Sequence, residues 1–490
     1  MFFILSNREL SRGLAFLLPL LVLCGCAAVG PNYEKPEIHT PDAWSEKIAG
    51  QVAADQQASL QTWWKIFNDP VLDELIERAR QANFDLKIAL ARISASRAAL
   101  GFAQGGKAPV INAGANASIE HPSESESNAG DENNIESFEL GLGASWEIDV
   151  FGRVRRTIEA AGARYQASVE DYRDVMVSLY ADVALTYIDI RSTQQRILAT
   201  QSNADSMAES LQLAEDRYTS GVNSRVDVVQ ARANLEVTLA AIPLLRISLQ
   251  ESINRLAVLL GQDAGSLQEE FRETMPLPKT AGLVGIGVPA DVLRQRPDIR
   301  RAERLLAIQS AEVGVATADL YPSFSLGGFF GLQSGSLSSL FNSSALAWGL
   351  QSPVQWNIFN GGRIANNIGI QNALLQARLL EYQQKVLEAI EEVDNAIYSF
   401  NLNRVRAGHL LSATDAISEA VDLVLVQYNT GLTDFNNVLV TQRDLLSQQD
   451  QLIVTQTNTE VALVALYKAL GGGWSPDQAI ELSDNAGTRN

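Results

Sequence analysis

The sequence predicts an α+β fold that is mainly α-helical and internally duplicated. Three observations support this prediction: motifs recur at a fixed spacing in the two halves, each half contains about 68 residues with almost no glycine or proline, and each half has two short segments of alternating side chains. A fixed spacing indicates a tandem repeat. Long stretches without helix breakers indicate long helices, and a period of two indicates β-strands.

The first 25 residues have the features of a secretory signal peptide. Arg8 and Arg12 precede an apolar run over residues 13–23, which is shorter than the roughly 20 residues of a membrane-spanning helix. The run ends in LCGC at residues 23–26, which resembles a bacterial lipobox. We therefore expect cleavage before Cys26 and lipid on this residue, as S-diacylglycerol and N-palmitoyl groups. The alternative is an ordinary secretory signal that leaves a free thiol.

Corresponding residues in the two halves lie 213 residues apart up to Pro109, and 210 residues apart from Trp146 onward. A small gap in the intervening region accounts for the difference. The chain is therefore a tandem duplication, and each half should build the same unit. The pairs include Asp85 and Asp298, Gly101 and Gly314, Pro109 and Pro322, Trp146 and Trp356, Gly152 and Gly362, and Tyr218 and Tyr428.

Each half is predicted to contain one very long helix that ends at a glycine. Residues 153–220 and 363–430 contain no proline and few glycines. At 1.5 Å per residue, each helix would be roughly 100 Å long. Gly221 and Gly431 then end the helices, because glycine readily adopts the left-handed conformation found at helix C-termini.

A returning helix is predicted after each of these glycines. Residues 432–470 contain apolar side chains that recur every seven residues, which favours coiled-coil packing. Residues 222–260 contain Pro243, where we expect a kink. Together with the short helix over 83–104, this returning helix would match the long helix in length and form a helical wall. A closed tube built from such walls would need several chains.

Four segments have the length and alternation of membrane-spanning β-strands. No segment after the signal peptide is predicted to be a membrane-spanning helix, so we expect the strands to cross the membrane. Four strands are too few to close a barrel, so a barrel must be shared between chains. The alternative is a soluble hairpin with one buried face. The segments are residues 109–119, 138–149, 321–332 and 346–359.

The composition excludes several functions. A net charge of −19 argues against nucleic-acid binding, which requires an excess of Lys and Arg. The only cysteines are Cys24 and Cys26, and the three histidines, His39, His121 and His409, are scattered. We therefore expect no catalytic residue, no metal site and no cofactor other than the lipid. No enzyme motif occurs in its required context, so the chain is not expected to be an enzyme.

A series of motifs occurs along the chain in a fixed order: Gly30-Pro31-Asn32-Tyr33, residues 63–70, Asn83-Phe84-Asp85-Leu86, residues 146–152, residues 296–303 and Tyr428-Asn429-Thr430-Gly431. A chain with these motifs resembles the TolC-like outer-membrane efflux proteins, specifically the lipoprotein branch often called NodT-type. The resemblance covers residues 26–470 and implies a homotrimer. In such a homotrimer, the helices form an α-barrel tunnel across the periplasm, and the strands form a twelve-stranded β-barrel in the outer membrane. The resemblance also implies docking to a periplasmic adaptor protein and an inner-membrane pump that selects the cargo.

The same resemblance implies the site residues near the two glycine turns. These turns should lie at the periplasmic tip, where the adaptor docks and the tunnel narrows. Many relatives carry an acidic residue just beyond the second turn, where this chain has Val440. Asp227 and Asp434 are the alternative gate acids, although carboxylates there also stabilise helix N-termini. The expected adaptor contacts are Gly221, Val222, Gly431 and Leu432.

We therefore predict a lipid-anchored protein of the Gram-negative outer membrane that extends into the periplasm. Its predicted function is the passive, gated exit duct of a tripartite efflux pump, with a cation-favouring acidic lumen. The alternative is a non-conducting structural lipoprotein that spans the periplasm. Along the sequence, the predicted organisation is a signal peptide (1–25), a lipidated N-terminal segment (26–82), a first repeat (83–261), a linker (262–295), a second repeat (296–470) and a tail (471–490). In space, the predicted β-barrel segments are 108–150 and 320–360, and the predicted tunnel segments are 83–104, 152–260, 297–317 and 362–470.

Overall fold

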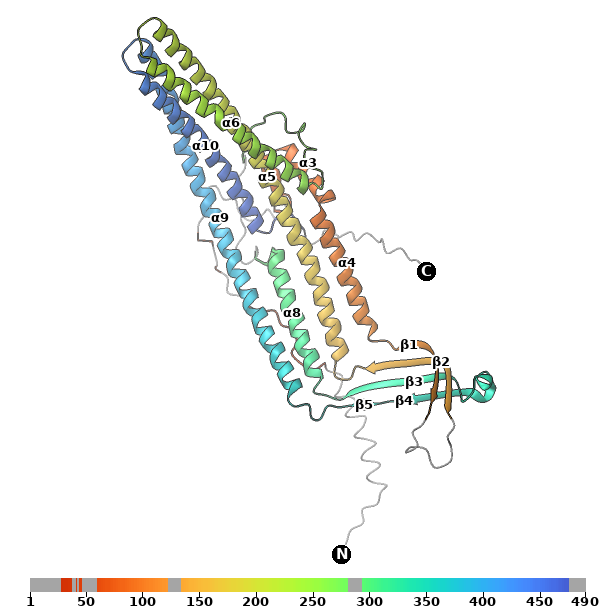
Figure 1. The fold of residues 1–490 in the computed structure, drawn as a ribbon. Helices are drawn as coiled ribbons and strands as arrows, with labels where there is room; N and C mark the ends of the chain where they lie inside the picture. Colours follow the sequence, from red (N-terminus) through yellow and green to blue (C-terminus); the bar gives the residue numbers. More distant parts are fainter. Residues whose placement is uncertain are drawn as a thin grey trace. The chain divides into compact units, whose positions relative to one another are not determined.

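The computed structural model describes residues 28–37, 41, 44–45, 60–121, 134–280 and 293–475. The predicted signal peptide and Cys26 lie outside these residues. The fold is mainly helical, with one modest sheet (Figure 1). In chain order the elements are η1 (Trp63–Phe67), α3 (Pro70–Ala82), α4 (Phe84–Gly105), β1 (Val110–Glu120), β2 (Ile135–Ile148), α5 (Arg153–Thr219), α6 (Arg225–Leu259), α8 (Pro297–Ala318), β3 (Ser323–Ser334), η2 (Leu337–Ser339), η3 (Ser343–Ala345), β4 (Leu346–Gln351), β5 (Val354–Gln355), α9 (Arg363–Asn429) and α10 (Phe435–Ala469).

The chain forms two compact units, and each takes segments from both halves of the sequence. The sheet unit contains the described residues of 1–37, 93–168 and 301–382. The helix unit contains those of 38–92, 169–300 and 383–490. The spatial division therefore differs from the division into repeats, because strands and helices of the two halves pair with each other.

The two halves build the same series of helices. The long helices α5 and α9 each have 67 residues, the returning helices α6 and α10 each have 35, and the short helices α4 and α8 each have 22. A hydrogen bond is repeated as well. The indole Nε1 of Trp146 donates to the carbonyl of Lys107 at 3.1 Å, and that of Trp356 donates to the carbonyl of Leu320 at 3.0 Å.

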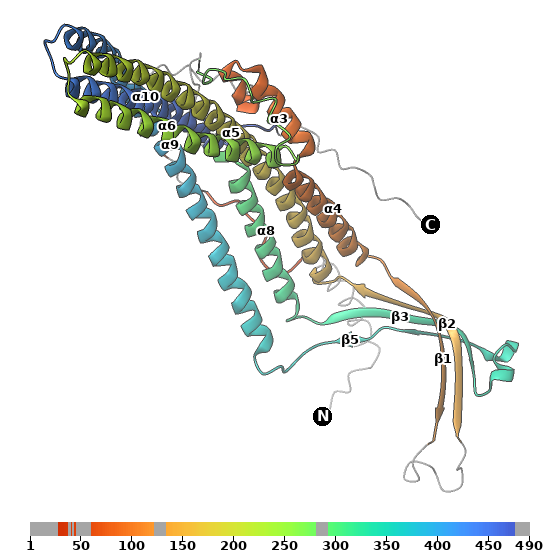
Figure 2. The same cartoon turned by 45° about the horizontal axis from the view of Figure 1, so that its top comes forward.

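The strands form one antiparallel sheet in the order β1-β2-β3-β4, with β5 also paired to β3 (Figure 2). The fourth strand, predicted over residues 346–359, is shorter and interrupted between β4 and β5. Pro353 lies in the interruption, and it has no N–H to donate to the sheet. Its carbonyl still accepts from the Ser325 N–H at 3.1 Å, so β4 and β5 continue along the same partner strand.

The largest hydrophobic core lies in the helix unit, where η1 and α3 pack on α5 and α10. Trp63 is 2% exposed and stacks on Tyr467 with ring centroids 5.4 Å apart. Asp69 caps α3 through the amides of the first turn and also accepts a 2.6 Å hydrogen bond from the Tyr187 hydroxyl. The cap of a short helix is thereby tied to the long helix α5.

Candidate functional site

Both long helices end in the same hydrogen-bonded turn. Gly221 has a φ of +73° and Gly431 a φ of +79°. In each turn the glycine N–H donates to the carbonyl three residues earlier at 3.0 Å, and the next N–H donates to the carbonyl five residues earlier at 2.9 and 2.8 Å. This pattern closes a helix around a left-handed residue. The following side chains, Val222 and Leu432, are 62% and 79% exposed, so each turn presents an apolar residue to solvent.

The returning helices begin with capped N-termini next to these turns. The Ser224 hydroxyl accepts from the Val226 N–H at 3.0 Å and caps α6. The Asp434 carboxylate accepts from the Asn437 N–H at 3.3 Å and caps α10. Asp227 lies in the first turn of α6 and is half-buried. Each carboxylate therefore has a position that stabilises a helix N-terminus, and their role in an acidic gate stays a prediction.

Side chains of the first turn join it to the second, and the two turns lie side by side (Figures 1 and 2). Arg217 donates to the carbonyl of Asn429 at 2.9 Å, and its guanidinium lies 4.8 Å from the ring centroid of Tyr428. The Asn223 amide donates to the Tyr428 hydroxyl. Burial raises the pKa of Tyr428, and the negative charge of Asp227 adds to this effect. Tyr428 therefore stays a neutral acceptor.

An apolar cluster lies beneath these polar contacts. Tyr428 is 2% exposed and packs on Phe435, which is 1% exposed, with ring centroids 5.0 Å apart. Both long helices and both returning helices contribute, so the cluster holds the four helix ends together. Its buried members are Ala214, Val228, Ala231, Tyr428, Phe435, Val438 and Leu439.

The structure brings together the two predicted turns but adds contacts that the sequence analysis missed. Tyr428 was part of a motif, yet Arg217 and Asn223 were not candidates. Their partners lie 212 and 205 residues away in the sequence. The available signal was the repeat itself, because Arg217 and Asn223 differ from their counterparts Gln427 and Thr433.

One face of the sheet carries a row of exposed apolar side chains. Leu142 of β2, Phe330 of β3 and Trp348 of β4 are directly paired neighbours. Their exposures are 50%, 60% and 76%. Side chains opposite each other on adjacent strands share a face, so they form one continuous patch. An exposed apolar patch of this kind marks a surface that contacts membrane or protein.

Helix α6 bears on the expectation that no segment after the signal peptide is a membrane-spanning helix. Among the described residues, it is long and apolar enough to cross a membrane by length and composition, although the sequence analysis found no such segment. The same test is passed by some helices of soluble proteins. Its apolar side chains are mostly exposed, so within one chain it presents an uncovered apolar surface. The exposed apolar residues of α6 include Val226, Val229, Val237, Leu244 and Ile247.

Comparison with known proteins shows similarity over nearly the whole chain. Residues 75–262 and 288–472 match the family described as "Outer membrane efflux protein". Nodulation protein T of Rhizobium leguminosarum bv. trifolii is 30% identical over 456 residues, which cover 93% of this chain and 96% of that protein. The solvent efflux pump outer membrane protein SrpC of Pseudomonas putida is 32% identical over 470 residues, with 94% and 98% covered.

Solved structures show the same fold. The outer-membrane channel OprN is 35% identical, with a TM-score of 0.84 over 91% of this chain and 100% of that chain. The CmeC outer membrane channel of Campylobacter jejuni has a TM-score of 0.84 at 23% identity, over 94% of this chain and 97% of that chain. The fold is therefore that of a TolC-like outer-membrane channel, as the sequence motifs predicted.

Proposed function

We propose that this chain is the passive exit duct of a tripartite efflux pump. The chain belongs to the outer membrane efflux protein family and is located in the Gram-negative outer membrane. The members of this family are outer-membrane components of efflux pumps. The observation that carries the proposal is the exposed apolar row on the sheet. Apolar side chains on the outer face of a sheet are stable when that face contacts lipid.

The duct would be a homotrimer. Among the described residues, β1 and β4 each pair on one side only. Unpaired strand edges are not tolerated in lipid, so each edge would pair with a neighbouring chain and three chains would close a twelve-stranded β-barrel. The exposed apolar side chains of α6 would pack against a neighbouring chain in the α-barrel, where the long helices form coiled coils.

The two helix turns would form the gated periplasmic tip. A periplasmic adaptor protein would contact Gly221, Val222, Gly431 and Leu432, since these residues expose backbone and apolar side chains at the turns. The contacts of Arg217 and Asn223 with the second turn would hold the tip closed. Adaptor and inner-membrane pump would open it by binding the open state more tightly than the closed state. Asp227 and Asp434 remain the proposed gate acids.

Lipid on Cys26, as S-diacylglycerol and N-palmitoyl groups, would anchor the chain in the outer membrane in addition to the sheet. The cargo would be small molecules selected by the pump. The names of two relatives, a solvent efflux protein and a toluene efflux protein of Pseudomonas putida, support apolar small molecules as one cargo class.

Mass and conductance measurements test the proposal. The detergent-solubilised protein should have three times the mass of one chain, and planar bilayers should show stable, cation-favouring conductance. A monomer without conductance would instead support a structural lipoprotein that spans the periplasm.

A lipidation-deficient variant separates the anchor from the barrel. Cys26→Ser should keep the trimer and its conductance if the sheet spans the membrane. A soluble, monomeric variant would contradict the proposed barrel.

A further inference from the structure

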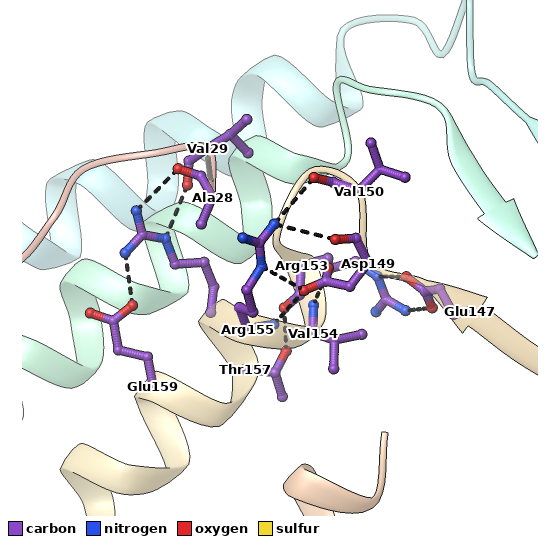
Figure 3. A network of polar contacts seen from close by, with 11 residues as sticks. Ala28, Val29, Glu147, Asp149, Val150, Arg153, Val154, Arg155, Thr157 and Glu159 are labelled. Atoms are coloured by element: carbon purple, nitrogen blue, oxygen red, sulfur yellow. Dashed lines mark hydrogen bonds and ion pairs between the residues drawn. The ribbon is translucent and has the colours of Figure 1, made fainter. Parts of the chain in front are cut away.

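The N-terminal strap, defined as residues 28–37, is bound to α5 by Arg156. Ala28 and Val29 of the strap lie beside the start of α5 in Figure 3. The Arg156 side chain is 4% exposed. Its guanidinium donates to the carbonyls of Val29 at 3.0 Å, Gly30 at 3.2 Å and Ala28 at 3.5 Å, and to the side chain of Asn32 at 2.8 Å. Glu159 balances its charge at 2.7 Å. Most of the hydrogen bonds that the Arg156 guanidinium donates therefore go to one short segment.

The neighbouring arginines have other partners. Arg153 bonds with Glu147, and Arg155 bonds with Asp149 at 3.0 Å. Arg156, in contrast, donates to backbone carbonyls and a side chain of the strap.

Glycines let the strap approach the helices closely. Gly30 has a φ of +84°, and a Cβ there would lie 2.5 Å from the Cα of Gly314 in α8. A Cβ on Gly314 would lie 2.8 Å from the Arg156 side chain. A Cβ on Gly152 would lie 2.5 Å from that of Ala28. The strap therefore fits only where these three positions lack side chains.

Glu303 of α8 holds the other end of the strap. Its carboxylate accepts from the Tyr33 hydroxyl at 3.2 Å and from the Lys35 ammonium at 3.0 Å. Arg304 adds a hydrogen bond to Glu303 and lies 5.6 Å from the centre of the Tyr33 ring. The strap is thus tied to α5 by Arg156 and to α8 by Glu303.

The equivalent positions of the other repeat lack this arrangement. Asn366 takes the place of Arg156. A Cβ on Gly101, the counterpart of Gly314, would meet nothing within 4 Å, and one on Gly362, the counterpart of Gly152, would meet only Asn366 at 3.6 Å. The docking site is therefore specific to one repeat and is not a by-product of the duplicated fold.

We propose that Arg156 is a positioning residue that docks the strap and thereby fixes where the lipid anchor joins the protein; this rests on the proposed lipidation of Cys26. Cys26 precedes Ala28 by two residues, so it can lie no more than about 7 Å from it. Ala28 is held at Gly152, directly after Phe151. Phe151 stacks on Tyr321 at 4.6 Å, and aromatic rings at strand ends mark the membrane interface. The acyl chains would then enter the membrane beside the sheet.

Hydrogen exchange of the full-length protein in detergent tests the docking. Arg156→Gln should speed exchange in the strap by about tenfold or more, because several hydrogen bonds are lost together. Arg156→Lys should restore protection in part, since one ammonium cannot reach all the acceptors of a guanidinium. Arg164→Gln, which removes an exposed 3.5 Å ion pair to Glu312 between the same helices, is the matched control and should leave the strap protected. Unchanged strap exchange in Arg156→Gln would overturn the proposal.

A glycine pair tests the same site without removing a charge. Gly314→Ala should expose the strap, whereas Gly101→Ala, with open space at the equivalent helix position, should not. Equal strap exchange in the two variants would contradict the docking geometry.

The lipid itself is the last control. The strap of Cys26→Ser should remain protected, because protein contacts hold it; loss of protection would mean that the lipid, and not Arg156, holds the strap. Conductance is not the readout, so this result is independent of whether the chain is a duct.

Discussion

The two helix turns have the same backbone conformation, but the corresponding tyrosine is exposed in one turn and buried in the other. Tyr218 and Tyr428 stand three residues before their glycines and accept the same backbone hydrogen bond. Yet Tyr218 is 44% exposed and Tyr428 is 2% exposed. The neighbouring residues cause the difference. Phe435 packs on Tyr428, whereas its counterpart beside Tyr218 is Arg225.

The two repeats therefore share the backbone of the turn, but the side chains of the two turns are specialised. The second turn provides the aromatic residues of the apolar cluster, and the first provides the polar groups that contact the second turn. Arg217 and Asn223 donate across to the second turn. Variants of these residues, compared with variants of their repeat counterparts, separate the roles of the two turns.

Removal of the aromatic centre of the cluster should have the largest effect. Phe435→Ala should lower the free energy of opening of the tip by about 3–5 kcal/mol, because it leaves a cavity among buried side chains. Hydrogen exchange over residues 424–439 measures this. Arg225→Ala, at the equivalent exposed position, should change it by less than about 0.5 kcal/mol. Similar effects of the two variants would refute the specialisation of the turns.

A proline exchange tests the returning helices. Pro243 of α6 corresponds to Ile453 of α10. Ile453→Pro should destabilise α10 by about 3 kcal/mol, because proline removes a helix hydrogen bond and clashes with the preceding turn. Pro243→Ala should not destabilise α6. Thermal unfolding followed by circular dichroism compares the variants, and a more harmful change at Pro243 would show that α6 requires its proline.

Loss of one hydroxyl should loosen the tip more weakly. Tyr428→Phe removes the acceptor of the Asn223 amide and should cost about 1 kcal/mol. If the contact holds the tip closed, bilayer recordings should show a larger open fraction. Tyr218→Phe is the control, since the exposed ring lies outside the cluster. An equal change in both variants would count against the proposed gate contact.

The smallest expected effect is a pH dependence of hydrogen exchange in the strap. Burial opposes ionisation of Glu303, but the bonds from Lys35 and Arg304 outweigh it, so its pKa lies below the ordinary 4.5. A carboxylate with a lowered pKa stabilises the folded state above its unfolded pKa, and this stabilisation is lost as pH falls through the folded pKa. Strap exchange, corrected for the intrinsic rate, should therefore rise below about pH 4.5. Glu303→Gln should remove this pH dependence, and a persistent dependence would implicate another group.

Much of the fold could be predicted because its signals are local. The long helices end within a residue of the predicted positions, since a glycine after a proline-free stretch ends a helix by its own backbone freedom. Pro353 carried a readable signal too, because a proline within a predicted strand indicates an interruption. The apolar exposed surface of α6 was harder to read, since its composition is not distinct from that of a buried helix.

The candidate sites could also be predicted only in part from the sequence. The turn glycines follow from sequence, while the partners of Arg217, Arg156 and Glu303 lie far away in the chain. An arginine at a helix start has many available acceptors, and nothing in its neighbourhood specifies which one it meets. Its role is visible only once the strap is placed beside it.

The duplication, the helix lengths, the turns and the family can be predicted from the amino-acid sequence, because each depends on residues close together or on a spacing that can be counted. The folded structure was needed to show which tyrosine is buried, which arginine holds the strap, and how four helix ends share one cluster. These depend on side chains brought together from distant segments, and packing rather than local preference selects among the possible partners.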